Sequence, residues 1–144
     1  RLRFALLTWR REQEVGYPSD TLPDLATVWR DESWEEYSRH VFAMHEMLRA
    51  VGSRPVLVAA PLAAQFDPGM LRHDARYVLK PQSKLAALCR RAHVPMLDLY
   101  PVFYRHQGWK LYRRDGIHCN ERGHEVTADA LMNFLESNRL VPPN

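Results

Sequence analysis

The chain has 144 residues, of which 46% are hydrophobic and 26% charged, and its formal net charge is +3 at pH 7. This length and composition suit one folded domain with a hydrophobic core and exclude an intrinsically disordered chain. The basic residues are scattered rather than gathered in a stripe, which argues against nucleic-acid binding, and no apolar run approaches the roughly 18 residues of a membrane-spanning helix.

The first 31 residues predict a variable arm. Residues 1–12 have the apolar spacing of a short helix, and the stretch that follows contains Gly16, Pro18 and Pro23 with no sustained period. Glycine and proline without periodicity are typical of a loop. We therefore predict a helix and loop arm over 1–31, joined to a domain over 32–144.

A strong amphipathic helix is predicted over residues 33–51. Ser33 and Glu36 have the spacing of a capping box, and Gly52 is typical of a helix C-terminus. We expect its apolar stripe to lie in the core. The stripe consists of Trp34, Tyr37, Val41, Met44, Leu48 and Val51.

Two short apolar stretches, near 55–60 and 94–99, are typical of parallel strands buried on both faces. Helices are predicted over 70–80, from Pro81 onward, briefly from Pro101, and finally from about Glu121 to Asn138 with Asn120 as N-cap. The helix after Pro81 has an apolar stripe that consists of Leu85, Leu88, Cys89 and Ala92.

This alternation of helices and strands predicts an α/β fold in which the two strands are parallel neighbours. Two strands are few for a parallel sheet, because such sheets normally lie between helical layers. We therefore expect an exposed apolar edge, or an amino-terminal segment or second chain that completes the sheet.

The segment LYRRDGIHCNERGHEVTADAL, residues 111–131, gathers reactive side chains before the last helix. Asp115 and His118 are three residues apart, which places them on one face if the turn is helix-like. The carboxylate could then accept the Nδ1–H of His118 and leave Nε2 bare as a general base. Gly116 gives the turn backbone freedom, and Gly123 lets the helix start pack closely. The loop follows a strand, where α/β proteins bind ligands.

Other interpretations of this segment stay open. The side chains of His118, Cys119, Glu121 and His124 are types that bind zinc, although the spacing of the two histidines is wrong for one helix face. Cys119 beside a histidine also suggests a cysteine–histidine pair, although adjacent side chains point in different directions. His124, in the first helical turn, is interpreted as a packing or capping residue.

Outside this segment the candidates are weaker. Asp98 at a strand end is interpreted as a polar cap on the sheet edge rather than a site residue. Isolated aromatic residues could line an acyl or sugar pocket, although such residues more often pack under loops. These aromatic residues are Trp9, Trp29, Trp109 and Tyr112.

Three stretches together resemble one enzyme family. DGIHCNERGHEVTADAL resembles the last block of the SGNH (GDSL-type) hydrolases, Asp-x-x-His followed by Gly-His and a terminal helix. GSRPVLVAAPL and VPMLDLYPVF resemble that family's last two strands, so the resemblance covers about residues 33–138. It implies a parallel-sheet, three-layer, flavodoxin-like architecture, of which this chain is the carboxy-terminal part. It also implies that His118 is the catalytic base and Asp115 its orienting acid, with no cofactor and no metal.

The family's other motifs are absent from this sequence. No serine follows Gly-Asp, and no asparagine precedes Asn120. We therefore expect the nucleophilic serine and the oxyanion glycine and asparagine to lie in a segment outside this chain, which alone should be inactive. The resemblance also suggests an extracytoplasmic or membrane-anchored location, because many relatives carry an amino-terminal anchor.

Two functional hypotheses follow. The first is a Ser-His-Asp hydrolase of a carboxylic ester, such as a lipid, a thioester or an acetylated sugar. The second is a non-catalytic, hydrolase-like module that binds a lipid, a glycan or a partner chain. A nucleic-acid binder is a third, favoured only by the basic isoelectric point.

Overall fold

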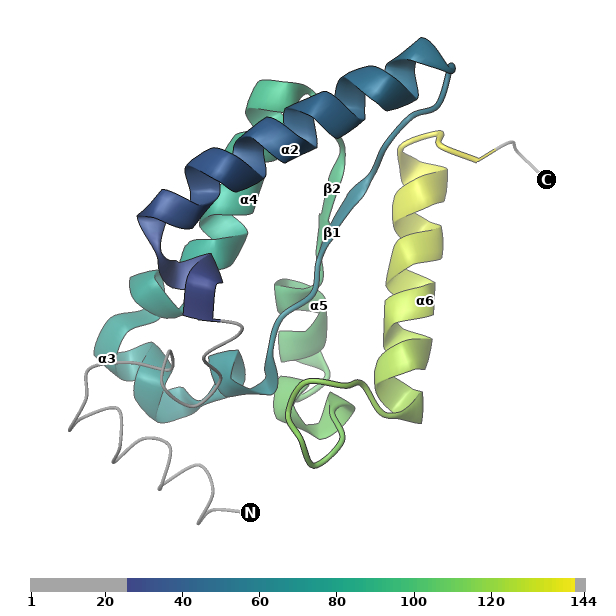
Figure 1. Cartoon of the computed structure of the whole chain (residues 1–144). Helices are drawn as coiled ribbons and strands as arrows, with labels where there is room; N and C mark the ends of the chain where they lie inside the picture. The colour runs from purple at the N-terminus through teal and green to yellow at the C-terminus, as the bar shows by residue number, and fades with distance from the viewer. Residues whose placement is uncertain (1–25, 142–144) are drawn as a thin grey trace.

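The computed structural model describes residues 26–141, and these residues are mostly helical (Figure 1). The predictions for residues 1–25, including the first helix and most of the arm, lie outside the described residues. None of the described helices is long and apolar enough to cross a membrane. The helical elements are η2 (Ala26–Trp29), α2 (Asp31–Ala50), η3 (Ala63–Phe66), α3 (Pro68–Val78), α4 (Lys80–Ala92), α5 (Tyr100–Arg105), η4 (Gly108–Leu111) and α6 (Glu121–Ser137), where η marks a 3-10 helix.

The two strands, β1 (Leu57–Ala59) and β2 (Met96–Asp98), pair in parallel. Their register joins Leu57 to Met96 and Ala59 to Asp98. The prediction of two parallel neighbours is therefore confirmed. Helix α4 runs between the strands in sequence and packs against both of them.

The predicted three-layer α/β architecture is wrong for the described residues. Helices α2 and α4 lie on one side of the strand pair and α6 on the other (Figure 1), but two strands of three residues each do not make a sheet layer. Proline explains why the strands are shorter than predicted, since it has no N–H to donate to a ladder. Pro55 and Pro61 flank β1, and Pro95 precedes β2.

The hydrophobic core consists of two clusters, one on each side of the strand pair. The first cluster joins η3, β2, α5, η4 and α6 and contains Phe66, Leu97, Leu99, Phe103, Leu111, Tyr112 and Val126. The second joins α2, α4 and β1 and contains Val41, Ala59, Leu85, Leu88 and Cys89. The predicted apolar stripe of α4 is confirmed, because all four of its residues are buried.

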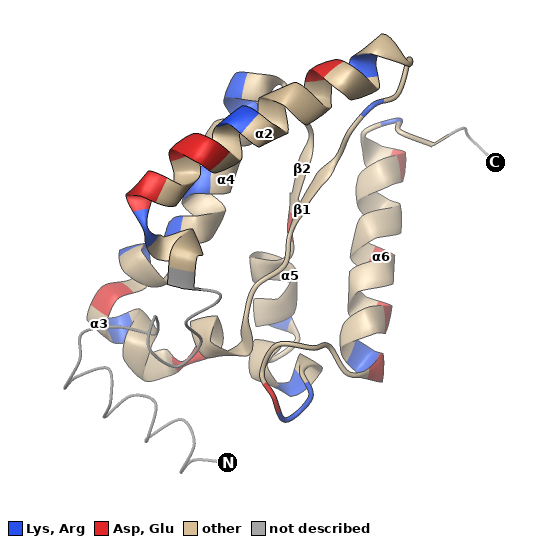
Figure 2. Ribbon diagram, viewed as in Figure 1, with Lys and Arg blue, Asp and Glu red and all other residues tan. Residues whose placement is uncertain are grey.

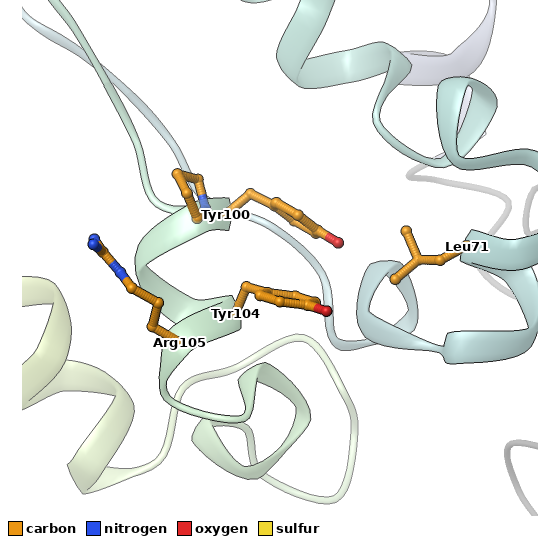
Figure 3. A pocket seen from close by; sticks show the side chains of 5 residues that line it. Leu71, Tyr100, Tyr104 and Arg105 are labelled. Carbon is orange, nitrogen blue, oxygen red and sulfur yellow. The ribbon is translucent and has the colours of Figure 1, made fainter.

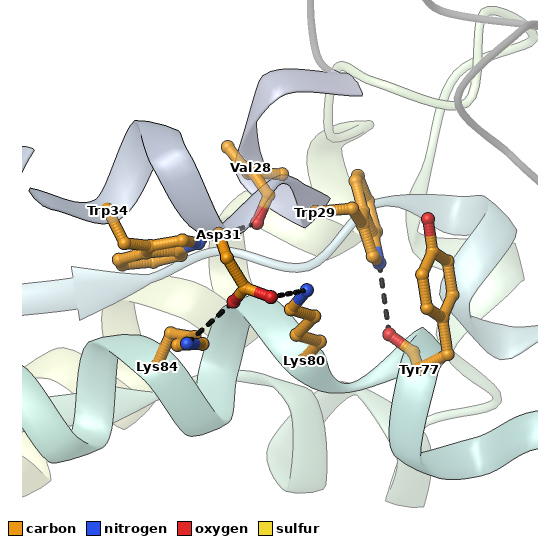
Figure 4. Close-up of polar contacts among 7 residues, drawn as sticks. All are labelled: Val28, Trp29, Asp31, Trp34, Tyr77, Lys80 and Lys84. Atoms are coloured by element: carbon orange, nitrogen blue, oxygen red, sulfur yellow. Dashed lines mark hydrogen bonds and ion pairs between the residues drawn. The ribbon is translucent and has the colours of Figure 1, made fainter.

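Helix α2 begins at Asp31 rather than at the predicted Ser33. Arg30 is the N-cap residue and provides no side-chain cap, so the predicted capping box does not form. The Asp31 carboxylate instead contacts Lys80 Nζ at 3.0 Å and Lys84 Nζ at 2.7 Å (Figure 4). A carboxylate in the first turn is also favoured by the helix dipole. Contacts with α4, distant in sequence, therefore set the start of α2.

The apolar stripe of α2 is largely uncovered, contrary to the prediction. Val41 is the buried member of the helix, whereas Tyr37 and Met44 are exposed and Val51 is 74% exposed. The predicted end at Gly52 is confirmed, since α2 ends at Ala50 and Gly52 has a φ of +74°. Val58 of β1 is also exposed, which agrees with the expectation of an apolar edge.

Two buried glutamines fix η3 against α4. The side-chain amides of Gln65 and Gln82 donate to each other's oxygens at 3.0 and 3.1 Å. Gln65 Nε2 also donates to the carbonyl of Val78 at 2.7 Å, and the N–H of Leu62 donates to Gln65 Oε1. Buried amides are stable only when paired in this way. The residues after β1 are therefore held rigidly beside the loop that carries Asp115 and His118.

Candidate active site

The loop over residues 112–120 is closed at its base by backbone pairing. Tyr112 and Cys119 form an isolated antiparallel bridge, and the N–H of Arg113 donates to the carbonyl of His118 at 2.8 Å. The N–H of Asn120 donates to the carbonyl of Leu111 at 2.9 Å. Both ends of the loop are thus fixed relative to η4 and to the start of α6.

The tip of the loop is tied to the chain that follows β1. Gly116 has a φ of +72°, in the left-handed region where glycine has no steric penalty. Its carbonyl accepts a hydrogen bond from the N–H of Ala63 in η3 at 3.0 Å. This contact places the turn at the end of the strand pair where β1 leaves it, which is the edge that the sequence predicted.

Asp115 and His118 form the predicted hydrogen-bonded pair. His118 Nδ1 lies 2.9 Å from Asp115 Oδ2. The other carboxylate oxygen, Oδ1, accepts the backbone N–H groups of Ile117 at 2.8 Å and His118 at 2.9 Å. Because the ionised carboxylate can only accept, Nδ1 is the donor and the neutral imidazole has its lone pair on Nε2.

The electrostatics of the pair favour this arrangement. The backbone N–H groups of His118 and Ile117, followed by the imidazole, lower the pKa of Asp115 to about 2. The carboxylate is therefore ionised throughout the range in which histidine titrates. The His118 side chain is 74% exposed, and its Nε2 has no hydrogen-bond partner among the described residues. A substrate or a nucleophile could therefore reach it.

The start of α6 positions the loop from the other side. Asn120 is the N-cap, as predicted, and its Oδ1 accepts the N–H of Gly123 at 3.0 Å. Its Nδ2 donates to the carbonyls of Lys110 and Tyr112. A Cβ at Gly123 would collide with the carbonyl oxygen of Leu111, which confirms the predicted need for close packing here.

The remaining residues of the segment do not join the pair. His124 is exposed, so its interpretation as a packing residue is wrong: it lies in the first turn of α6 on the face that looks away from the core. Cys119 is half-buried, and burial raises the pKa of its thiol, which disfavours the thiolate that a cysteine nucleophile needs. Within residues 26–141, no three side chains of histidine, cysteine, aspartate or glutamate gather as a metal site would require.

The Asp98 carboxylate lies at the end of β2 and bonds to the backbone two residues further on. Its Oδ1 accepts the N–H of Tyr100 at 2.9 Å, and burial raises the pKa of its carboxyl. The interpretation as a polar cap on the sheet edge stays a prediction.

The aromatic candidates do not converge on one pocket. Trp29 is buried and donates to the carbonyl of Tyr77 at 3.1 Å (Figure 4), and Tyr112 is buried in the first core cluster. Trp109 is exposed, with the Lys110 ammonium 5.3 Å from its ring centre. Trp9 lies outside the described residues.

The sequence analysis missed a hollow between α3 and α5 (Figure 3). It is lined by Leu71, Tyr100, Pro101, Tyr104 and Arg105. The stretch YPVFY directly after a strand, with tyrosines four apart, is the pattern that could have indicated it.

A histidine that a carboxylate orients in this way, with Nε2 exposed, can act as a general base. No family model matches the chain. It is similar to the sesquiterpene phosphatase astK of Aspergillus oryzae (strain ATCC 42149 / RIB 40), with 31% identity over 104 residues, which cover 67% of this chain and 51% of astK. The chain thus spans about half the length of this curated relative. A phosphatase is a hydrolase, so this similarity is compatible with hydrolytic chemistry in general but does not favour carboxylic esters.

Proposed function

We propose that this chain carries the acid–base half of an ester hydrolase, with His118 as the general base and Asp115 as the residue that orients it. One observation carries the proposal: the 2.9 Å contact between His118 Nδ1 and an Asp115 carboxylate whose other oxygen is held by two backbone amides. This arrangement selects the tautomer with Nε2 bare and stabilises the imidazolium that forms when Nε2 takes a proton.

The reaction then follows from the acid–base chemistry. Nε2 of His118 takes the hydroxyl proton of a serine as its oxygen attacks the ester carbonyl, and it returns that proton to the departing alcohol. In the second half, Nε2 takes a proton from water, which attacks the acyl-enzyme and releases the acid. The proton passes back to the serine oxygen. Asp115 stays ionised throughout, in keeping with the low pKa of its carboxyl.

The nucleophile is proposed to lie outside this chain. The resemblance of residues 115–128 to the SGNH hydrolases supports a serine as the nucleophile, and no serine of this sequence follows Gly-Asp. We propose that this serine lies on an amino-terminal segment or second chain that pairs with the edge of β1 and covers the exposed side chain of Val58.

A second candidate is the hydrolysis of a phosphate ester, and two observations favour it. The similar protein from Aspergillus oryzae is a phosphatase. In addition, Arg113 and Arg114 precede Asp115 in the same exposed loop, where basic and acidic residues lie together (Figure 2), and neither forms an ion pair among the described residues. Guanidinium groups bind phosphate oxygens through paired hydrogen bonds.

The test uses the full-length gene product with three probes. We expect turnover of p-nitrophenyl butyrate, no turnover of p-nitrophenyl phosphate, and labelling by a fluorophosphonate of one serine outside residues 1–144. Turnover of the phosphate alone, without a labelled serine, would replace the first candidate by the second. A folded protein inactive on both substrates and unlabelled would leave a non-catalytic module that binds a lipid, glycan or partner chain, and would refute both enzymatic candidates.

A further inference from the structure

The hollow between α3 and α5 has a volume of about 520 Å³ and is open to solvent. In Figure 3 the rings of Tyr100 and Tyr104 both extend from α5 toward Leu71 of α3, whereas Arg105 points away from the space between them. The volume lies within the roughly 300–1,000 Å³ of small-molecule sites. The lining of this space is therefore mostly apolar: two aromatic rings, Leu71 and Pro101, with Arg105 as its charged residue.

The two tyrosines are held in place by a row of stacked rings. Phe66 and Tyr100 stack with ring centres 4.9 Å apart and planes 3° apart, and Tyr100 and Tyr104 follow at 6.1 Å and 28°. Phe66 is buried in the core, and Tyr104, at the outer end of the row, is 62% exposed. A ligand would therefore meet a preorganised aromatic surface, which lowers the entropic cost of binding.

This hollow lies at the same end of the strand pair as the Asp115–His118 loop. Helix α5 begins directly after β2, and η3, which carries Phe66, follows β1. Phe66 also contacts Tyr112, at the base of the loop, with ring centres 6.3 Å apart. The aromatic row and the catalytic pair are thus built on one packed unit.

We infer that this hollow binds the hydrocarbon part of the substrate, an acyl chain or an isoprenoid, while the ester bond lies at His118. The inference rests on the proposed function. A sugar ring would need several hydrogen-bond partners. The Tyr100 hydroxyl already donates to the carbonyl of Gln65 at 3.5 Å, which leaves the Tyr104 hydroxyl and Arg105 as the polar groups of the lining. A charged group would need a counter-charge, and the one charged lining residue, Arg105, points away from the space. A hydrocarbon needs neither hydrogen-bond partners nor a counter-charge, and its burial against Leu71 and the two rings is favourable.

The test is an NMR titration of the full chain with geraniol, 1-octanol and methyl glucoside as probes. We expect saturable shifts at the amides of residues 71, 100 and 104 with one or both hydrocarbon alcohols and none with the glucoside. Geraniol alone would point to an isoprenoid and octanol alone to an acyl chain, whereas saturable binding of both would support a hydrocarbon site that takes either. Tyr104→Ser should weaken binding about tenfold, because it removes the exposed end of the aromatic surface. Met132→Ser removes another exposed apolar side chain, on α6, and should change the Kd less than twofold.

Three results would overturn the inference: no saturable shifts at the hollow, saturable shifts only at the exposed end of α2, or an unchanged Kd in a folded Tyr104→Ser protein. Different results would refute the proposed function, because hydrocarbon binding does not require a nucleophile whereas hydrolysis does. Hydrocarbon binding without hydrolysis by the full-length protein would refute the hydrolase and leave the hollow as a binding site. Hydrolysis with an unchanged KM in Tyr104→Ser would refute the claim that the hollow binds the substrate, and would leave the proposed hydrolase in place.

Discussion

The hydroxyl of Tyr112 donates a hydrogen bond to the carbonyl of Pro61, which lies 51 residues earlier in the chain. Tyr112 begins the loop that carries Asp115 and His118, and Pro61 follows β1. Burial raises the pKa of Tyr112, so the hydroxyl stays protonated and remains a donor. This contact, together with the bond between Ala63 and Gly116, fixes the loop relative to the strand pair.

Removing that hydroxyl should destabilise the fold. In Tyr112→Phe the buried carbonyl of Pro61 loses its partner, which should lower the free energy of unfolding by about 1–3 kcal/mol. Tyr104→Phe is the matched control. Because Tyr104 is exposed, this substitution should change the free energy of unfolding by less than about 0.5 kcal/mol. Urea unfolding curves of both variants measure the difference, and equal values would show that the Tyr112 contact contributes nothing.

The Asp115 carboxyl should titrate near pH 2 in an NMR pH series, as its lowered pKa requires. In His118→Ala the midpoint should rise yet stay below the usual range, because the two backbone N–H groups are the first causes of the shift. A return to the usual range, near 3.9, would mean that the imidazole alone lowers the pKa.

The same pKa sets the direction of acid destabilisation. Because the folded-state pKa of Asp115 lies below its unfolded value, its contribution to stability is complete above about pH 4 and is lost as the pH falls toward 2. Asp115→Asn should therefore lose less stability than the wild type between pH 4 and 2. Parallel acid-unfolding curves for the two proteins would contradict this account.

Gly123→Ala should be strongly destabilising even though alanine is the better helix former by about 1 kcal/mol. The added Cβ would collide with the Leu111 carbonyl and lie 2.9 Å from the Cβ of Cys119, and backbone cannot move aside cheaply. We expect a loss of more than about 2 kcal/mol.

Gly52→Ala is the control for that substitution. Gly52 has a positive φ but open space around its Cβ position, so alanine there should cost only about 1 kcal/mol of backbone strain. Thermal melts compare the two variants, and a smaller loss at Gly123 than at Gly52 would show that the close packing can relax.

The chain of residues 1–144 by itself should not turn over p-nitrophenyl butyrate faster than free imidazole does. It provides a general base and an orienting carboxylate, but by the proposal it has neither the serine nor the oxyanion groups that stabilise the transition state. Saturable turnover, abolished by replacing one serine of this sequence, would place the nucleophile within the chain.

Local pattern predicted the helices well and the strands less well. The end of α2 at Gly52 and the N-cap at Asn120 depend on residues a few positions apart, and both were predictable. The start of α2 was not, because Asp31 is held by lysines of α4 that lie 49 and more residues away. The exposure of Met44 and Val51 was not predictable either, since helical spacing shows which residues share a face and not what covers it.

The candidate site, too, was predictable from the sequence only in part. Asp115 and His118 are three residues apart, so their contact follows from the turn between them. The two tyrosines of the hollow share a face of α5 because they are four residues apart, but the approach of α3 to α5 that completes the hollow depends on residues distant in sequence. His124 was wrongly interpreted as packed because a helix start has both a buried and an exposed side, and Gly123 occupies the buried one.

The central claim, that His118 is the general base, is tested most directly by kcat/KM of three variants of the full-length protein, with melting curves alongside. His118→Ala should lose several orders of magnitude, and Asp115→Asn should also lose heavily, because it keeps the geometry but favours the wrong tautomer. His124→Ala is the control six residues further on, and it should keep turnover near that of the wild type, because its side chain is exposed and forms no hydrogen bond or ion pair with Asp115 or His118. Near-wild-type kcat/KM in a folded His118→Ala protein would contradict the account, and a loss confined to His124→Ala would move the base to that residue.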